Sequence, residues 1–190
     1  MPLRSLIDNK SWTLEAMVVK YADEIAQRHH DIEDGLTANI IGRKEFETVF
    51  RGIFSEYLKE SDLTLLKNIN EAKNLNCALH DIASLILGFY SRNLIEHSTQ
   101  ELKLLLKEYK FKYHEEFDSV KDHIYNSCNV LKFIGFDKDF DEKDKEFQEY
   151  LINRILNSHL AQSMDGKASY ILRNLIKAYM SNPKQLLMGL

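Results

Sequence analysis

The segment from Leu75 to Ile95 constrains the fold of this 190-residue chain more than any other stretch. Its apolar residues recur at steps of three and four, so a helical rotation of about 100° per residue brings them to one side. These residues are Leu75, Ala78, Leu79, Ile82, Leu85, Ile86 and Phe89. A helix with so broad an apolar side needs partners along its length, and we therefore expect it to form one wall of the core.

The other side of the same segment carries small residues. Cys77, Ser84, Gly88 and Ser91 follow one another at steps of seven, four and three, which keeps them on one helical face. Small side chains allow a second helix to approach closely. The sequence therefore predicts that this face is an interface, and a homodimer is the expected assembly.

The chain is poor in residues that favour turns. It has 2 prolines and 7 glycines, against 44% apolar and 28% charged residues, whereas a β-sheet protein of this length normally carries more turn residues. At this size about 70% of the surface of the unfolded chain can be buried in one domain. We predict an all-α fold, a single-domain bundle (residues 1–190) of six to seven helices, one of them about 35 residues long.

Local signals set the expected ends of the helices. Gly35 and the pair Asp165-Gly166 are expected to end helices, and Ser98 with Glu101 forms a capping box that should start the long one. The expected helices cover 11–34, 43–58, 61–74, 75–97, 98–134 and 141–163, with a last helix around 170–179, a leader at 1–10 and a tail at 183–190.

Charge and hydropathy argue against two classes of partner. Lys and Arg total 25 against 29 Asp and Glu, a formal net charge of −4 without long blocks of one sign, so the cation cluster needed for nucleic-acid binding is missing. The sequence contains no run of about 18 apolar residues, the length that spans a membrane, and the first ten residues do not resemble a signal peptide. Cys77 and Cys128 stand alone, which is typical of reduced thiols. We expect a cytoplasmic protein that binds neither nucleic acid nor membrane.

His80 and Asp81 form the most suggestive local motif. On a helical wheel His80 lies more than about 120° from the centre of the apolar stripe, so its imidazole can be reached from solvent and oriented by the neighbouring carboxylate. Phosphoacceptor histidines need this arrangement. The simpler interpretation is an ordinary surface or interface histidine, because a His-acid pair is common by chance.

Three histidines are candidates for a haem or metal ligand. His97 is four residues before Glu101, a spacing that puts two ligands on one helix face, but the expected helix break at Ser98 would separate the two. His80 and His29 are the other candidates, and haem needs only one good axial ligand. The simpler interpretation of all three is a solvated or hydrogen-bonded histidine at the edge of the core.

The aromatic residues Phe46, Phe50 and Phe54 follow one another at steps of four. They are expected in the core or, as the alternative, in the wall of a ligand pocket. The chain contains no Gly-x-Ser-x-Gly segment, phosphate-binding glycine-rich loop, Cys-x-x-Cys or His-Glu-x-x-His, which argues against the commonest enzyme chemistries.

The sequence therefore favours a non-enzymatic helical module with a regulatory or sensory role. It would act through protein contact, as a homodimer or on a protein partner, and could be the input module of a larger signalling protein. Two alternatives remain: a globin-like sensor that binds haem or a metal, and a histidine phosphotransfer protein that uses His80.

Overall fold

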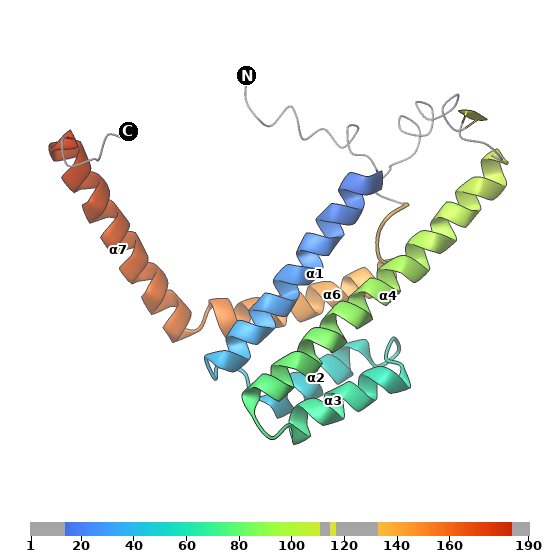
Figure 1. Cartoon of the computed structure of the whole chain (residues 1–190), viewed down its shortest axis with the longest axis horizontal. Coiled ribbons are helices and arrows are strands. Elements are labelled where there is room, and N and C mark those ends of the chain that lie inside the picture. The colour runs from blue at the N-terminus through green and yellow to red at the C-terminus, as the bar shows by residue number, and fades with distance from the viewer. Residues whose placement is uncertain (1–13, 111–114, 117–132, 184–190) are drawn as a thin grey trace.

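A computed structural model describes residues 14–110, 115–116 and 133–183 of the chain (Figure 1). These residues form helices and turns, and no strand occurs among them. The main helices are α1 (Leu14–Thr37), α2 (Arg43–Phe54), α3 (Glu60–Glu71), α4 (Leu75–Tyr109), α6 (Lys138–Leu151), the π-helical turn η3 (Ile152–Leu156) and α7 (His159–Ser181). The predicted all-α class and the presence of one 35-residue helix, α4, are confirmed. The leader, Cys128 and the tail beyond Pro183 lie outside the described residues.

Helix α4 is the element against which the others are arranged. Helices α1 and α3 both pack against it, and α6 contacts both α1 and α2 (Figure 1). The side of α4 that the sequence predicted to be buried is buried from Ala78 onward: Ala78, Ile82, Leu85, Ile86 and Phe89 are fully shielded from solvent. Leu79 is half-buried, and Leu75 at the start of the helix is exposed. The apolar periodicity of this segment therefore determined which side of α4 faces the core.

Aromatic rings from three helices fill the centre of the core. Phe50 and Phe54 of α2 meet Phe89 of α4 edge to face, each with ring centroids 5.1 Å apart, and Phe54 lies 5.5 Å from Phe140 of α6. Edge-to-face contacts of this kind add to the stabilisation from burial. Phe46, Phe50 and Phe54 are all inaccessible to solvent, so the structure places them in the core and not in a pocket wall.

The predicted start of a long helix at Ser98 is wrong. Helix α4 continues through this residue to Tyr109 and ends at Lys110, whose φ of 55° is left-handed and whose N–H bonds to the carbonyl of Leu106 at 2.9 Å. Ser98 does not cap a helix because its hydroxyl is used elsewhere: it is buried and accepts a hydrogen bond from the N–H of Gly135 at 3.2 Å. The continuous helix expected over 98–134 is therefore interrupted at residue 110.

Two glycines expected to end helices lie inside them. Helix α1 continues through Gly35, where an added Cβ would lie 2.8 Å from Cδ1 of Ile155. The glycine therefore allows the Ile155 side chain to pack closely against the α1 backbone. Helix α7 continues through Gly166, and the chain breaks earlier, where the hydroxyl of Ser158 accepts a bond from the N–H of Ala161 at 3.2 Å. A serine cap satisfies a free N–H at a helix start. The helix boundary therefore lies at Ser158 and not at the predicted residues 165–166.

The small-residue face of α4 is open to solvent. Cys77, Ser84 and Gly88 are exposed and Ser91 is half-buried, and nothing lies within 4 Å of the position of a Cβ at Gly88. No other described element of the chain covers this face. A homodimer through these four residues stays a prediction.

Helix α7 leaves the other helices at its N-terminal end and extends away from them (Figure 1). None of its 23 residues is buried. Among the described helices, none combines the length and the apolar character that crossing a bilayer requires.

Candidate functional site

Three adjoining cavities form a groove between α1 and α6. Their volumes are about 140, 350 and 330 Å³. The first two share Arg28 and Gln148, and the second and third share Tyr21, Phe136 and Asp141. The cavities therefore follow one another along the two helices, and we refer to them together as the groove.

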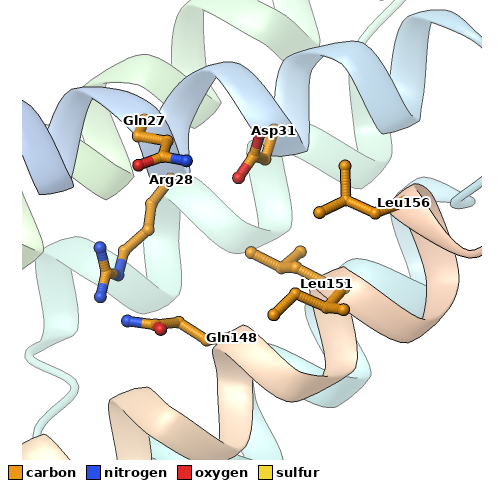
Figure 2. Close-up of a pocket in the computed structure, with 7 residues that line it drawn as sticks. Gln27, Arg28, Asp31, Gln148, Leu151 and Leu156 are labelled. Carbon is orange, nitrogen blue, oxygen red and sulfur yellow. The ribbon is translucent and has the colours of Figure 1, made fainter. Parts of the chain in front are cut away.

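A buried ion pair closes the floor of the groove. Arg28 of α1 donates two hydrogen bonds to the carboxylate of Asp144 on α6, from Nε at 2.8 Å and from Nη2. The same carboxylate accepts bonds from the hydroxyl of Tyr90 at 2.7 Å and from Nε2 of Gln148 at 3.0 Å. Figure 2 shows Arg28 reaching toward Gln148 across the first cavity. This pairing holds the two helices together, because separating them would leave a buried charge without its partner.

Burial changes the protonation behaviour of this cluster. Loss of solvent raises the pKa of Asp144, an effect that Arg28 and Tyr90 oppose. Burial, followed by the nearby charge of Asp144, raises the pKa of Tyr90 well above its ordinary value, so its hydroxyl stays protonated and keeps donating. The groups of this cluster are bonded to one another and hold the base of the groove in place, so a ligand would contact the groove walls.

The walls of the second cavity carry amines, carboxylates and an aromatic ring. Lys20 lies 3.5 Å from Glu24 on α1, and Lys145 lies 2.6 Å from Asp141 on α6, in each case from Nζ to a carboxylate oxygen. The ring of Tyr21 stands edge-on to that of Phe136 at 5.4 Å. Burial and the charges of Glu24 and Asp141 raise the pKa of Tyr21. Its hydroxyl is thus a neutral donor beside two ion pairs.

His97 and Glu101 of α4 line the far end of the groove. Because α4 is continuous through Ser98, the two side chains share one helix face, contrary to the expected break between them. Nδ1 of His97 lies 3.0 Å from the carbonyl oxygen of Gly135. A carbonyl only accepts, so Nδ1 is the donor in this contact, and Nε2 is the acceptor in the neutral form of the ring.

The other histidines predicted as ligands do not meet His97. His80 and His97 are 17 residues apart on α4, which is about 26 Å along a helix. His80 is 83% exposed with Nδ1 3.5 Å from Asp81, and His29 on α1 lies 3.9 Å from Glu33. Within the part of the chain that the structure describes, no group of three or more His, Cys, Asp and Glu is arranged to hold a metal ion.

Sequence reasoning missed the cluster under the groove, although a signal for it was present. Arg28 follows Ile25 by three residues and precedes Ile32 by four, and Asp144 follows Phe140 by four residues and precedes Phe147 by three. All four apolar residues are buried. A charged residue in phase with a core face predicts a buried partner of opposite sign, but the spacing alone does not say which residue that is.

Comparison with known proteins finds relatives that share one name. A deoxyguanosinetriphosphate triphosphohydrolase-like protein of Geobacter metallireducens is 25% identical over 171 residues, which is 90% of this chain and 39% of the relative. A protein of the same name from Geobacter sulfurreducens is 23% identical over the same shares. Another from Thiobacillus denitrificans is 42% identical over 57 residues, 30% of this chain and 15% of the relative. No family model and no solved structure matches the chain.

These matches correct the function inferred from the sequence. The relatives are named as hydrolase-like proteins, which contradicts the predicted non-enzymatic regulatory or sensory module and the haem-sensor and phosphotransfer alternatives. The chain spans about two fifths of the length of the curated relatives it matches over most of its own length.

Proposed function

We propose that this chain is the helical part of an enzyme that hydrolyses a deoxynucleoside triphosphate, with dGTP as the first substrate to test. The observation that carries the proposal is the extent of the match: proteins named deoxyguanosinetriphosphate triphosphohydrolase-like align with 90% or more of the chain. The reaction that the name describes adds water across the bond between the α-phosphorus and the 5′ oxygen. The products are deoxyguanosine and inorganic triphosphate.

The groove has the polar groups that a nucleotide requires. Lys20 and Lys145 lie on opposite walls, and amines bind phosphate oxygens through charge-assisted hydrogen bonds. Tyr21 and Phe136 lie between the second and third cavities, where an aromatic ring can stack on a base. Glu24 and Asp141 stand beside the lysines. Mg²⁺ on a triphosphate is commonly held by one or two such carboxylates.

The order of groups along the groove suggests how the nucleotide lies. The lysines and carboxylates line the second cavity, whereas His97 and Glu101 line the third. The triphosphate with its Mg²⁺ is therefore assigned to the second cavity, with the base toward Phe136. The carboxylate of Glu101, together with Nε2 of His97 in the neutral form of the ring, is then available to accept from the donor groups of a guanine.

Binding of Mg·dGTP to the purified chain tests this assignment. Isothermal titration calorimetry should show that Lys20→Gln and Lys145→Gln each weaken binding by about tenfold, the loss expected for one charged hydrogen bond. Lys67→Gln is the matched control, because Lys67 on α3 is exposed and does not line the groove. Absence of Mg·dGTP binding, or equal losses in all three variants, would contradict the proposal.

Product analysis tests the chemistry separately. Incubation of the whole enzyme that contains this chain with Mg·dGTP, followed by ion-exchange chromatography, should release deoxyguanosine and triphosphate in equal amounts. Release of phosphate or pyrophosphate would show that a different phosphate bond is hydrolysed. We also propose that the protein is cytoplasmic, which the free thiol of Cys77 supports.

A further inference from the structure

Helix α7 exposes far more apolar surface than a single surface helix normally does. Its large apolar side chains are between 47% and 77% exposed; they are Leu160, Met164, Tyr170, Ile171, Leu172, Leu175, Ile176 and Met180. A helix with this composition is normally covered by a partner. Ala161 and Ser163 near its start are half-buried, but none of its residues is buried by the rest of the described chain.

One face of α7 has the spacing of a helix-pairing seam. Six residues follow one another at steps of three, four, three, four and three: Ala161, Met164, Ala168, Ile171, Leu175 and Ala178. Alternating steps of three and four repeat every seven residues and keep the seam facing a second helix. This spacing favours a helical partner over an irregular surface. We call these six residues the α7 seam.

The α7 seam is complementary to itself when a second copy is turned end for end. With the two-fold axis between Ser169 and Tyr170, Met164 faces the partner's Leu175 and Ala168 faces the partner's Ile171. Ala161 then faces the partner's Ala178 at each end. Large residues thus meet at some levels and an alanine meets a large residue or another alanine at the rest, as interdigitated packing requires. A self-complementary surface is the condition for a closed two-fold dimer.

Charge and geometry are compatible with the antiparallel pairing. Arg173 and Lys177 lie roughly opposite the seam at 100° per residue, and Lys167 approaches the partner's Asn174, so like charges do not meet. Because α7 leaves the other helices at its N-terminal end (Figure 1), antiparallel pairing puts the two bodies at opposite ends. Parallel pairing would bring both bodies to one end.

The length of α7 is sufficient for a specific contact. Its 23 residues make a rod about 34 Å long and about 10 Å wide. Two such rods in contact over half of each circumference bury about 1,000 Å² in total, the lower limit for a specific interface. We propose that α7 pairs antiparallel with α7 of a second copy, and that this contact makes the chain a dimer.

Sedimentation equilibrium over a concentration series tests the dimer without any nucleotide. The wild-type chain should pass from monomer to dimer as concentration rises, and Ile171→Asp should raise the dissociation constant by at least about tenfold. Met180→Asp is the matched control, because Met180 is 77% exposed but lies outside the seam. A wild-type chain that stays monomeric, or equal losses from Ile171→Asp and Met180→Asp, would overturn the proposal.

The exposed face of α4 is the competing dimer surface. Gly88→Arg adds a large side chain in open space on that face and should leave the α7 dimer unchanged. Loss of the dimer in Gly88→Arg but not in Ile171→Asp would overturn the proposal and assign the contact to α4. Far-UV circular dichroism of each variant checks that the helices are retained.

Spin-label distances determine the orientation. Labels are placed at Ser169→Cys or Ser181→Cys in a chain that carries Cys77→Ser and Cys128→Ser. Antiparallel pairing predicts that the two copies of residue 169 lie at almost the same level, about one helix diameter (about 10 Å) apart at the backbone, whereas the axial rise separates the two copies of residue 181 by about 35 Å. Short distances at both positions would show parallel pairing and overturn the proposal.

Discussion

Arg28 and Asp144 form a buried two-bond ion pair although they are 116 residues apart in the sequence. Arg28 is 9% and Asp144 3% exposed at the side chain. The pair joins α1 to α6 at the floor of the groove, and Tyr90 and Gln148 complete the shell of donors around the carboxylate. The relative position of the two groove walls therefore depends on a contact that neither helix can make alone.

Removing one partner of this pair should destabilise the fold strongly. Asp144→Leu leaves the Arg28 guanidinium buried without a counter-charge, and we expect a loss of about 3–5 kcal/mol in the free energy of unfolding. The double variant Arg28→Met/Asp144→Leu should recover part of the loss, because no charge remains buried. Urea unfolding measures both. A double variant that is less stable than Asp144→Leu would contradict the assignment of a buried ion pair.

Ser98→Ala distinguishes a tertiary contact from a helix cap. The substitution leaves the N–H of Gly135 without its acceptor, which should lower the free energy of unfolding by about 1–3 kcal/mol. Helical content should stay the same or rise, because alanine is the best helix former. Thermal unfolding and far-UV circular dichroism measure the two effects. A fall in helical content of the folded protein would indicate that Ser98 starts a helix.

Gly35→Ala should destabilise the chain, whereas Gly52→Ala should not. An added Cβ at Gly35 meets Cδ1 of Ile155 at 2.8 Å and Cδ1 of Ile41 at 3.3 Å, so we expect a net loss of about 1 kcal/mol despite better helix propensity. At Gly52 the space is open, and a gain of about 0.5–1 kcal/mol is expected. Chemical unfolding compares the two variants. Ile155→Ala removes both close atoms of that side chain, Cδ1 at 2.8 Å and Cγ1 at 3.1 Å, so Gly35→Ala should cost less stability in the Ile155→Ala background; an equal loss in both backgrounds would show that the clash is not with Ile155.

The pair between Glu45 and Arg154 should make stability depend on pH. Arg154 donates to both oxygens of Glu45, from Nε at 2.7 Å and from Nη2 at 3.1 Å, and holds the pKa of that carboxyl below its ordinary value of 4.5. The unfolded chain then binds more protons near that value, so this contribution to stability is present above pH 4.5 and disappears as the pH falls through the folded-state pKa.

Glu45→Gln measures this pH dependence. The difference in unfolding free energy between wild type and Glu45→Gln should be small at neutral pH, because the pair is partly exposed, and should shrink further below pH 4.5. Arg154→Gln should give the same pH dependence, because it removes the other partner. A difference that grows as the pH falls would contradict the lowered pKa of Glu45.

Regular spacing within one segment could be interpreted from the sequence, whereas helix ends could not. Ser98 with Glu101 has the residues of a capping box, and Gly35 those of a helix end. Both signals were overridden because a distant partner, Gly135 or Ile155, uses the same atom or the same space. Local signals describe what a segment can do before it packs, and packing selects among those options.

The candidate site was less predictable than the fold for the same reason. The histidines singled out by sequence lie apart, with His80 and His97 separated along one helix, while Lys20 of α1 and Lys145 of α6 line the same cavity. Nothing in the spacing of either segment indicates which remote segment it faces. The proposed nucleotide site therefore depends on how α1 and α6 pack.

The sequence by itself determined that the chain is helical and which sides of its helices are apolar. The four-residue spacing of Phe46, Phe50 and Phe54 predicts that all three share one helix face, because helical periodicity is a local property of the backbone, and all three are buried. Only the tertiary structure decided that Arg28 meets Asp144 and that α7 is left uncovered by the rest of the described chain. Contacts between remote segments depend on how the helices pack, and no local spacing encodes that choice.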